Sequence, residues 1–292
     1  MGKATELKDT LQENTNLIFY DIMDYPIPKD HEVFLYDKKS NKKTSLNTFS
    51  RNKKNPHMNE YLAEVEKMEN LYKGIPFVEE IYLCNSITFN ALHAGSDIDL
   101  FIITQPGRIR STKFRAMLIF FFSGRKRTLS KKKKKVCLSF FITNDQKNLY
   151  NISIPNIDIY LCYRVQHLVL LYQDEEKKGE KSIFQQNKWI KAVLPNYQQQ
   201  QVINIGNTVF SGKSKIKIFL EKIGKGSIGD AIEGTLKYLQ LFIINTKRIF
   251  AAERNKDVIV NDSMLKFHQD IRQKIHLLYT MKTKNMNQKL KG

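Results

Sequence analysis

The chain has 292 residues, of which 41% are hydrophobic and 26% are charged, and its formal net charge is +19. These proportions are typical of a folded protein of one large or two modest domains, and they exclude a mostly disordered chain. Its most apolar windows, residues 116–122 and 236–244, are shorter than the roughly 20 residues that a membrane-spanning helix needs, so we expect no membrane partner.

The first 73 residues predict an N-terminal segment of helix and hairpin that is similar to a winged-helix module. A short amphipathic helix begins near residue 7, and a short strand at 33–36 precedes an exposed lysine-rich turn. From 59 to 72, apolar residues recur at the spacing of one helical face, and Gly74-Ile75-Pro76 is typical of a helix end. We place the first domain boundary after residue 73.

Residues 74–175 predict an α/β core on a small mixed sheet that spans roughly residues 75 to 145. Segment 97–104 alternates acidic and apolar residues and then becomes wholly apolar, as a strand does where it enters a covered sheet. The predicted elements are strands at 78–84, 97–104 and 136–143, a short helix at 87–92, a helix at 108–122 and a buried helix at 158–172. Residues 176–292 predict a mostly helical region whose last two long helices cover 236–252 and 265–282.

Two aspartates open the second predicted strand. Asp97 and Asp99 are two residues apart, which on a strand places both carboxylates on one face. Like charges held together are costly without a cation, and Mg²⁺ prefers carboxylate oxygens together with substrate phosphates. Asn85 and Ser86, where the preceding strand turns into a helix, offer backbone N–H groups to phosphate, and Ser96 is a further candidate phosphate ligand. This pattern is typical of metal-assisted nucleotidyl transfer, and a strand end with two exposed acids is the alternative.

These residues also resemble a known family. Cys84-Asn85-Ser86, followed by Ser96-Asp97-Ile98-Asp99-Leu100, is similar to the signature of nucleotidyltransferases of the DNA polymerase β superfamily. More narrowly, the chain resembles uncharacterised bacterial nucleotidyltransferase-domain proteins with a preceding winged-helix-like segment, through motifs at 20–26, 187–190, 194–196 and 265–268. The resemblance implies an NTP substrate, a Mg²⁺ cofactor, and Asp97 and Asp99 as catalytic metal ligands.

Two positions depart from the pattern of that family. Asn85 stands where the family has the glycine of a Gly-Ser pair, and asparagine tolerates the left-handed backbone better than most residues do. Active members of the superfamily also carry a third carboxylate on a later strand. On 136–143 that position would fall on Cys137 or Ser139, and neither side chain is a carboxylate.

A basic block follows the predicted metal strand. Between Asp99 and Asp145 the sequence has twelve Lys or Arg residues and no acidic residue. Arg108 and Arg110, at the start of a predicted helix, could clamp phosphate. The members of a predicted nucleic-acid patch are Arg115, Arg125, Lys126, Arg127, Lys131, Lys132, Lys133, Lys134 and Lys135. RNA or DNA is the expected partner of such a block, whereas a solvated loop and a lysine-rich composition are the alternatives.

The leading hypothesis is Mg²⁺-dependent transfer of a nucleoside monophosphate from an NTP to a hydroxyl group of RNA, protein or a small molecule. The alternatives are a catalytically impaired nucleotidyltransferase-like protein that binds nucleic acid, and an interaction module formed by the C-terminal helices. A third carboxylate within metal reach of Asp97 and Asp99 favours the enzyme, and its absence favours the binding protein. The cysteines form no C-x-x-C pair and the first fifteen residues lack a signal-peptide pattern, so we expect a cytoplasmic protein.

Overall fold

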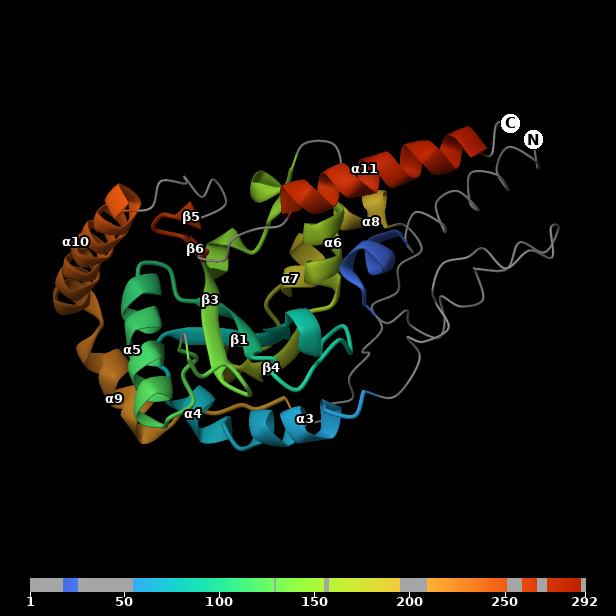
Figure 1. Cartoon of the computed structure of the whole chain (residues 1–292). Helices are drawn as coiled ribbons and strands as arrows, with labels where there is room; N and C mark the ends of the chain where they lie inside the picture. The colour runs from blue at the N-terminus through green and yellow to red at the C-terminus, as the bar shows by residue number, and fades with distance from the viewer. Residues whose placement is uncertain are drawn as a thin grey trace.

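Apolar segments at the centre of the sequence form a mixed β-sheet in the computed structural model (Figure 1). The structure describes residues 18–25, 55–128, 130–154, 158–194, 209–250, 259–266 and 272–289, without the side chains of 139, 243–250 and 285–289. Across these residues the strand order is β4-β1-β2-β3-β6-β5, with β1 (Val78–Cys84), β2 (Ile98–Thr104), β3 (Val136–Thr143), β4 (Val169–Gln173), β5 (Ile259–Val260) and β6 (Met264–Lys266). β2 and β3 are parallel, and the other neighbouring strands are antiparallel.

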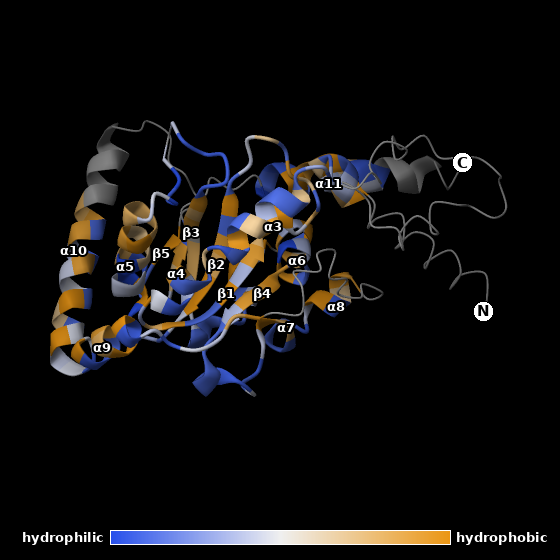
Figure 2. Cartoon of the chain, turned by 90° about the horizontal axis from the view of Figure 1, so that it is seen from below, coloured by the Kyte–Doolittle hydropathy of each residue, from blue (hydrophilic) through white to orange (hydrophobic). Residues whose placement is uncertain are grey.

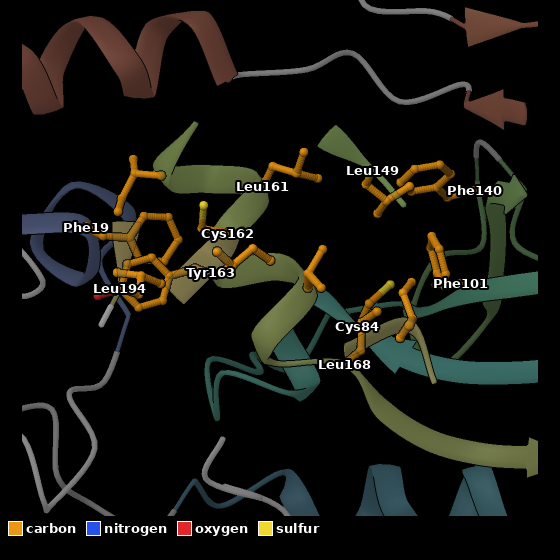
Figure 3. Close-up of a cluster of buried hydrophobic side chains, with 14 of the residues drawn as sticks. Phe19, Cys84, Phe101, Phe140, Leu149, Leu161, Cys162, Tyr163, Leu168 and Leu194 are labelled. Carbon is orange, nitrogen blue, oxygen red and sulfur yellow. The ribbon is translucent and has the colours of Figure 1, made fainter. Parts of the chain in front are cut away.

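The central strands send alternate side chains into two hydrophobic layers, because successive residues of a strand point to opposite faces. Tyr82 and Phe101 belong to the first layer, and Leu83 and Leu100 to the second. The first layer includes residues of α6 (Ile159–Gln166), α7 (Ile183–Gln186), α8 (Ile190–Val193), α11 (Arg272–Lys289) and the helical residues 18–23, and Figure 3 shows part of it. The second includes residues of α3 (Met58–Glu66), α4 (Glu69–Gly74) and α5 (Ile109–Phe122). Both strands are buried on both faces, which explains the apolar segments IYLC in β1 and LFII in β2.

The C-terminal helices α9 (Lys215–Ile223) and α10 (Gly226–Phe250) lie against α4 and α5 (Figures 1 and 2). A buried charged network fastens α9 to the sheet. The fully buried Lys217 Nζ donates to Val78 O at 2.8 Å and to Tyr172 Oη at 2.9 Å, while Glu221 Oε1 accepts from Phe77 N at 2.7 Å. The predicted mixed α/β class with a helical C-terminal region is therefore confirmed. None of the helices that the structure describes has both the length and the apolar character needed to cross a membrane.

Most predicted core elements are confirmed to within a residue or two. Strands 78–84 and 136–143 match β1 and β3, β2 begins one residue later than predicted, and helix 108–122 is α5. The predicted helix at 59–72 is present as two helices, α3 and α4, and 236–252 falls mostly within α10. The helix predicted from residue 7 falls largely outside the described residues, and the strand at 33–36 lies wholly outside them.

Two predicted helices are wrong in part, because a short apolar run fits a strand as well as a buried helix. Segment 158–172 is helical as α6 only to Gln166, and its end forms β4 beside β1. Segment 265–282 begins in β6, and helix α11 starts at Arg272. The predicted helix at 87–92 is replaced by a 3-10 turn, Asn85–Ile87. With β4, β5 and β6, the sheet extends beyond the predicted span of 75 to 145.

Candidate metal centre

Strand register brings the predicted metal ligands to one edge of the sheet. β1 is antiparallel to β2, and Cys84 pairs with Asp99. β2 is parallel to β3, and Asp99 pairs with Cys137. Asp97 directly precedes β2. The C-terminal end of β1 and the N-terminal ends of β2 and β3 therefore meet here, and we call Asp97, Asp99 and Cys137 the candidate metal centre.

The donor atoms of the candidate metal centre all lie within 4.8 Å of one another, so these residues could hold a metal ion. Asp99 and Cys137 are 7% and 8% exposed, whereas the side chain of Asp97 is 20% exposed. By its pairing with Asp99, Cys137 stands where a third carboxylate was expected, and within the part of the chain that the structure describes this group contains no third carboxylate. The two carboxylates suit a hard cation such as Mg²⁺, but the thiol does not, because sulfur is a soft ligand.

A guanidinium group already contacts the candidate metal centre. Arg127 Nη1 lies 2.6 Å from Asp97 Oδ2 and donates to Cys137 Sγ at 3.4 Å. Burial alone would lower the pKa of Arg127, but the hydrogen bond with Cys137 and the charge of Asp97 raise that pKa above its ordinary value. Arg127 was predicted as part of a nucleic-acid patch, and the structure instead places its guanidinium against Asp97 and Cys137.

Backbone pairing explains how Arg127 reaches the acids. The chain leaving α5 lies beside the start of β3, where Val136 N donates to Arg125 O at 2.7 Å and Arg127 N donates to Val136 O at 3.0 Å. The end of the lysine run is also fixed: Lys134 N donates to Ser96 O at 2.9 Å. The basic segment therefore passes along the same sheet edge as the two aspartates.

The turn after β1 adopts the backbone conformation expected of a glycine. Asn85 has φ +62, in the left-handed region, and its carbonyl accepts from Thr88 N at 2.9 Å. This turn follows Cys84, which pairs with Asp99, so Asn85 and Ser86 lie at the same sheet edge as the acids. The hydroxyl of Ser96, a predicted phosphate ligand, accepts from His93 N at 3.0 Å and so helps to hold the turn before Asp97.

Arg108 and Arg110 lie at the opposite end of β2 from the acids. Arg108 Nη1 is 2.7 Å from Asp230, and the 5%-exposed Arg110 lies 2.8 Å from Asp262. The strand residues 100–104, which lie between Asp99 and the end of β2, correspond to roughly 17 Å. The predicted phosphate clamp is therefore not supported, because the helix after a strand starts at that strand's far end, and both guanidinium groups instead fasten the C-terminal region.

The predicted nucleic-acid patch is divided in the structure. Arg125 pairs with Glu64 and Lys134 pairs with Glu60, both on α3. The other members differ in surroundings: Arg115 lies 5.6 Å from the centroid of the Phe77 ring, Lys135 Nζ donates to Gly124 O at 2.6 Å, Lys126 is half-buried, and Lys131, Lys132 and Lys133 are exposed. Among the described residues, the exposed part of the predicted patch is therefore the short lysine segment Lys131–Lys133.

Sequence reasoning missed a second cation near the acids, Arg164 on α6. Arg164 and Cys84 line one small cavity, and Cys84 pairs with Asp99. Burial and the charge of Asp99 raise the pKa of Cys84, and the charge of Arg164 opposes this rise. The guanidinium of Arg164 lies 5.3 Å from the centroid of the Tyr160 ring. The available signal was a single charged residue within the apolar helix segment IYLCYRV.

A cavity between α6 and the sheet is too small for a nucleotide base. Its volume is about 10 Å³, roughly the space of one water molecule, and Cys84, Phe101, Phe140 and Arg164 are among its lining residues. Figure 3 shows the apolar side chains that fill this region. A ligand of the candidate metal centre must therefore approach from outside this layer.

Comparison of the chain with protein-family models, with curated proteins and with solved structures found no match. The class of the protein is therefore assigned from its fold and its site alone. It is a mixed α/β protein with two carboxylates and a thiol gathered at one edge of its sheet.

Proposed function

We propose that the chain is a nucleotidyltransferase-like protein of the DNA polymerase β superfamily that binds an NTP and transfers its nucleotide poorly or not at all. One observation carries the proposal. The left-handed turn at Asn85, the carboxylates of Asp97 and Asp99, and the thiol of Cys137 in the third position all meet at one sheet edge. Two carboxylates beside such a turn suit a triphosphate with its cation. Among the residues that the structure describes, this group has no third carboxylate, which favours the impaired protein over the active enzyme.

The residues at this edge have distinct roles in the proposal. Asp97 and Asp99 hold a divalent cation, which when bound neutralises charge on the triphosphate. The turn at Asn85 and Ser86 donates backbone N–H groups to phosphate oxygens. Arg127, 2.6 Å from Asp97, exchanges that carboxylate for a phosphate oxygen, which offers a guanidinium an equivalent partner.

We expect impaired transfer because the thiol of Cys137, and not a carboxylate, lies beside the two aspartates. An acceptor hydroxyl must lose its proton as it attacks the triphosphate, and a positioned carboxylate is the usual base for that step. Cys137 offers a single sulfur atom at 8% exposure and already accepts a hydrogen bond from Arg127. A missing general base lowers the rate by about 10²- to 10⁴-fold.

Nucleic acid is the second partner in this proposal, and a specific observation favours it. The backbone of Lys134 and Lys135 pairs with Ser96 and Ile98, beside the acids, and Lys131, Lys132 and Lys133 directly precede it and are exposed. An exposed lysine run attracts a phosphate backbone without reading its bases. A nucleic-acid strand bound there would lie next to the nucleotide site.

Calorimetric titration of the full chain with each of the four NTPs in Mg²⁺ buffer tests the nucleotide site. We expect binding by the wild type and loss of binding in the double variant Asp97→Asn, Asp99→Asn. The matched control is Asp145→Asn with Glu66→Gln, because it removes the same charge from two exposed residues that are not part of the candidate metal centre. Absence of NTP binding in the wild type, or equal loss in the control, would contradict the proposal.

A further inference from the structure

The third donor of the candidate metal centre is built into the sheet. Cys137 lies on β3, paired with Asp99 on the parallel strand β2. Both residues are more than nine-tenths buried, and their donor atoms and that of Asp97 lie within 4.8 Å of one another. The position of the sulfur is therefore set by strand pairing and not by a surface loop.

This donor set disagrees with Mg²⁺ as the resident ion. Mg²⁺ requires near-octahedral oxygen ligands, whereas thiolate favours softer ions such as Zn²⁺ and Co²⁺. Three protein ligands with one open position is the usual arrangement of catalytic Zn²⁺ sites. Ligand atoms at 2.0 to 2.3 Å from one tetrahedral ion are separated by roughly 3.3 to 3.8 Å. Side-chain rotations that move the donor atoms by about 1 Å would therefore bring all three within bonding distance of one ion.

The other two cysteines provide an internal contrast. Cys84 and Cys162 are also buried, and burial raises the pKa of each thiol well above its ordinary value. Neither belongs to the group of donors that could hold a metal ion in the described part of the chain. Cys137 is the cysteine whose sulfur lies within 4.8 Å of carboxylate oxygens from two aspartates.

The candidate metal centre also already accommodates a positive group. Arg127 Nη1 contacts two of its three donors, Asp97 at 2.6 Å and Cys137 at 3.4 Å. A guanidinium this close to the carboxylate and the thiol leaves no space for a metal ion bound to the same oxygen and sulfur atoms. A metal ion therefore enters by displacing Arg127, whose side chain is 33% exposed and has room to move outwards.

We propose that Asp97, Asp99 and the thiolate of Cys137 bind a thiophilic divalent cation, of the Zn²⁺ and Co²⁺ type, in place of Arg127. On binding, the thiol of Cys137 loses its proton to the solvent and the sulfur donates an electron pair to the ion. No electron is transferred and no further reactant is needed. This inference deepens the proposed function, because it concerns the metal at the proposed nucleotide site.

Titration of the metal-free full chain with Co²⁺ alone, followed by absorption spectroscopy, tests the proposal. Thiolate bound to Co²⁺ gives a near-ultraviolet charge-transfer band that oxygen ligands do not give. We expect the band in the wild type and in Cys162→Ala, with release of one proton per ion. We expect no band and at least about ten-fold weaker binding in Cys137→Ser. Zn²⁺ should abolish the wild-type band, and excess Mg²⁺ should not.

Three results would overturn the proposal: Co²⁺ binding to the wild type without the band, persistence of the band in Cys137→Ser, or displacement of Co²⁺ by Mg²⁺. Thermal unfolding of Cys137→Ser establishes that the variant is folded. NTP binding separates this inference from the proposed function. If Cys137→Ser binds NTP with Mg²⁺ as the wild type does and no thiolate band forms, the inference fails and the function stands. If the band forms and no NTP binds, the function fails and the inference stands.

Discussion

Removal of the Arg127 side chain should increase the affinity of the protein for a divalent cation. In the structure, Arg127 Nη1 lies 2.6 Å from Asp97 Oδ2, and this contact must break before a metal ion binds that oxygen. In Arg127→Gln there is no ion pair to break, so the metal affinity should rise by the free energy of the pair.

The exposure of the two side chains sets the magnitude of this effect. They are 33% and 20% exposed, so solvent screens the pair and its free energy should be about 1 kcal/mol. That value corresponds to roughly a five-fold tighter dissociation constant. The metal-free variant should lose about the same 1 kcal/mol of unfolding free energy, and the metal-loaded variant should not.

Calorimetric titration with Co²⁺, together with urea unfolding of the metal-free and metal-loaded protein, measures both quantities. Arg125→Gln is the matched control, since Arg125 lies two residues away and pairs with Glu64 on α3 instead of with the acids. The control should bind Co²⁺ as the wild type does. Unchanged or weaker Co²⁺ binding by a folded Arg127→Gln variant would refute the competition between Arg127 and the metal.

Three further predictions concern lysines in different surroundings. Replacement of the exposed Lys131–Lys133 by serine should lower the slope of log nucleic-acid affinity against log salt by about 2 to 3, and an unchanged slope in filter-binding assays would make the run a solvated loop. Burial, with the charge of Lys126, lowers the pKa of Lys113 to about 7. Between pH 7 and the ordinary lysine pKa of about 10.5 the unfolded chain holds a proton at this side chain that the folded chain has lost, so Lys113 contributes a rise of stability with pH. Lys113→Met should lack that rise in urea unfolding at pH 7.5 and 9.5, and equal pH slopes would contradict the assignment. Lys217→Met should cost about 2 to 4 kcal/mol, because it leaves the carboxylates of Asp174 and Glu221 with one cation fewer. The exposed Lys222→Met on the same helix should cost less than about 0.5 kcal/mol by the same measurement.

The centre of the fold could be predicted from local sequence because its signals are local. The strands that became β1, β2 and β3 each contain a short apolar run, and the sheet buries β1 and β2 throughout. Asn85 stands in the position of a glycine, and its φ of +62 is the left-handed conformation that asparagine tolerates better than most residues. Asp97 and Asp99 were predicted as neighbours from strand periodicity alone, and their donor atoms belong to one group.

The errors have a different physical origin, since they depend on which strands pair. The apolar run at the end of segment 158–172 pairs with β1, and no local periodicity distinguishes such a run from a buried helix. Arg108 and Arg110 were placed near the acids by their position in the sequence, although the intervening strand carries them to its other end. The contact of Arg127 with Asp97 depends on pairing between the chain after α5 and the start of β3, which only the folded chain specifies.

Incubation of the wild-type protein with Mg²⁺, an NTP labelled on its α-phosphate and a mixture of RNA acceptors shows whether the protein binds an NTP without transferring its nucleotide. The double variant Asp97→Asn, Asp99→Asn is the reference, and labelled NTP retained by the protein and label transferred to product are measured in the same samples. We predict that the wild type retains NTP, that the double variant does not, and that the wild type forms product at least about 10²-fold more slowly than a typical enzyme rate of about 10 s⁻¹. Retention of NTP by neither protein, or rapid transfer by the wild type, would contradict this prediction.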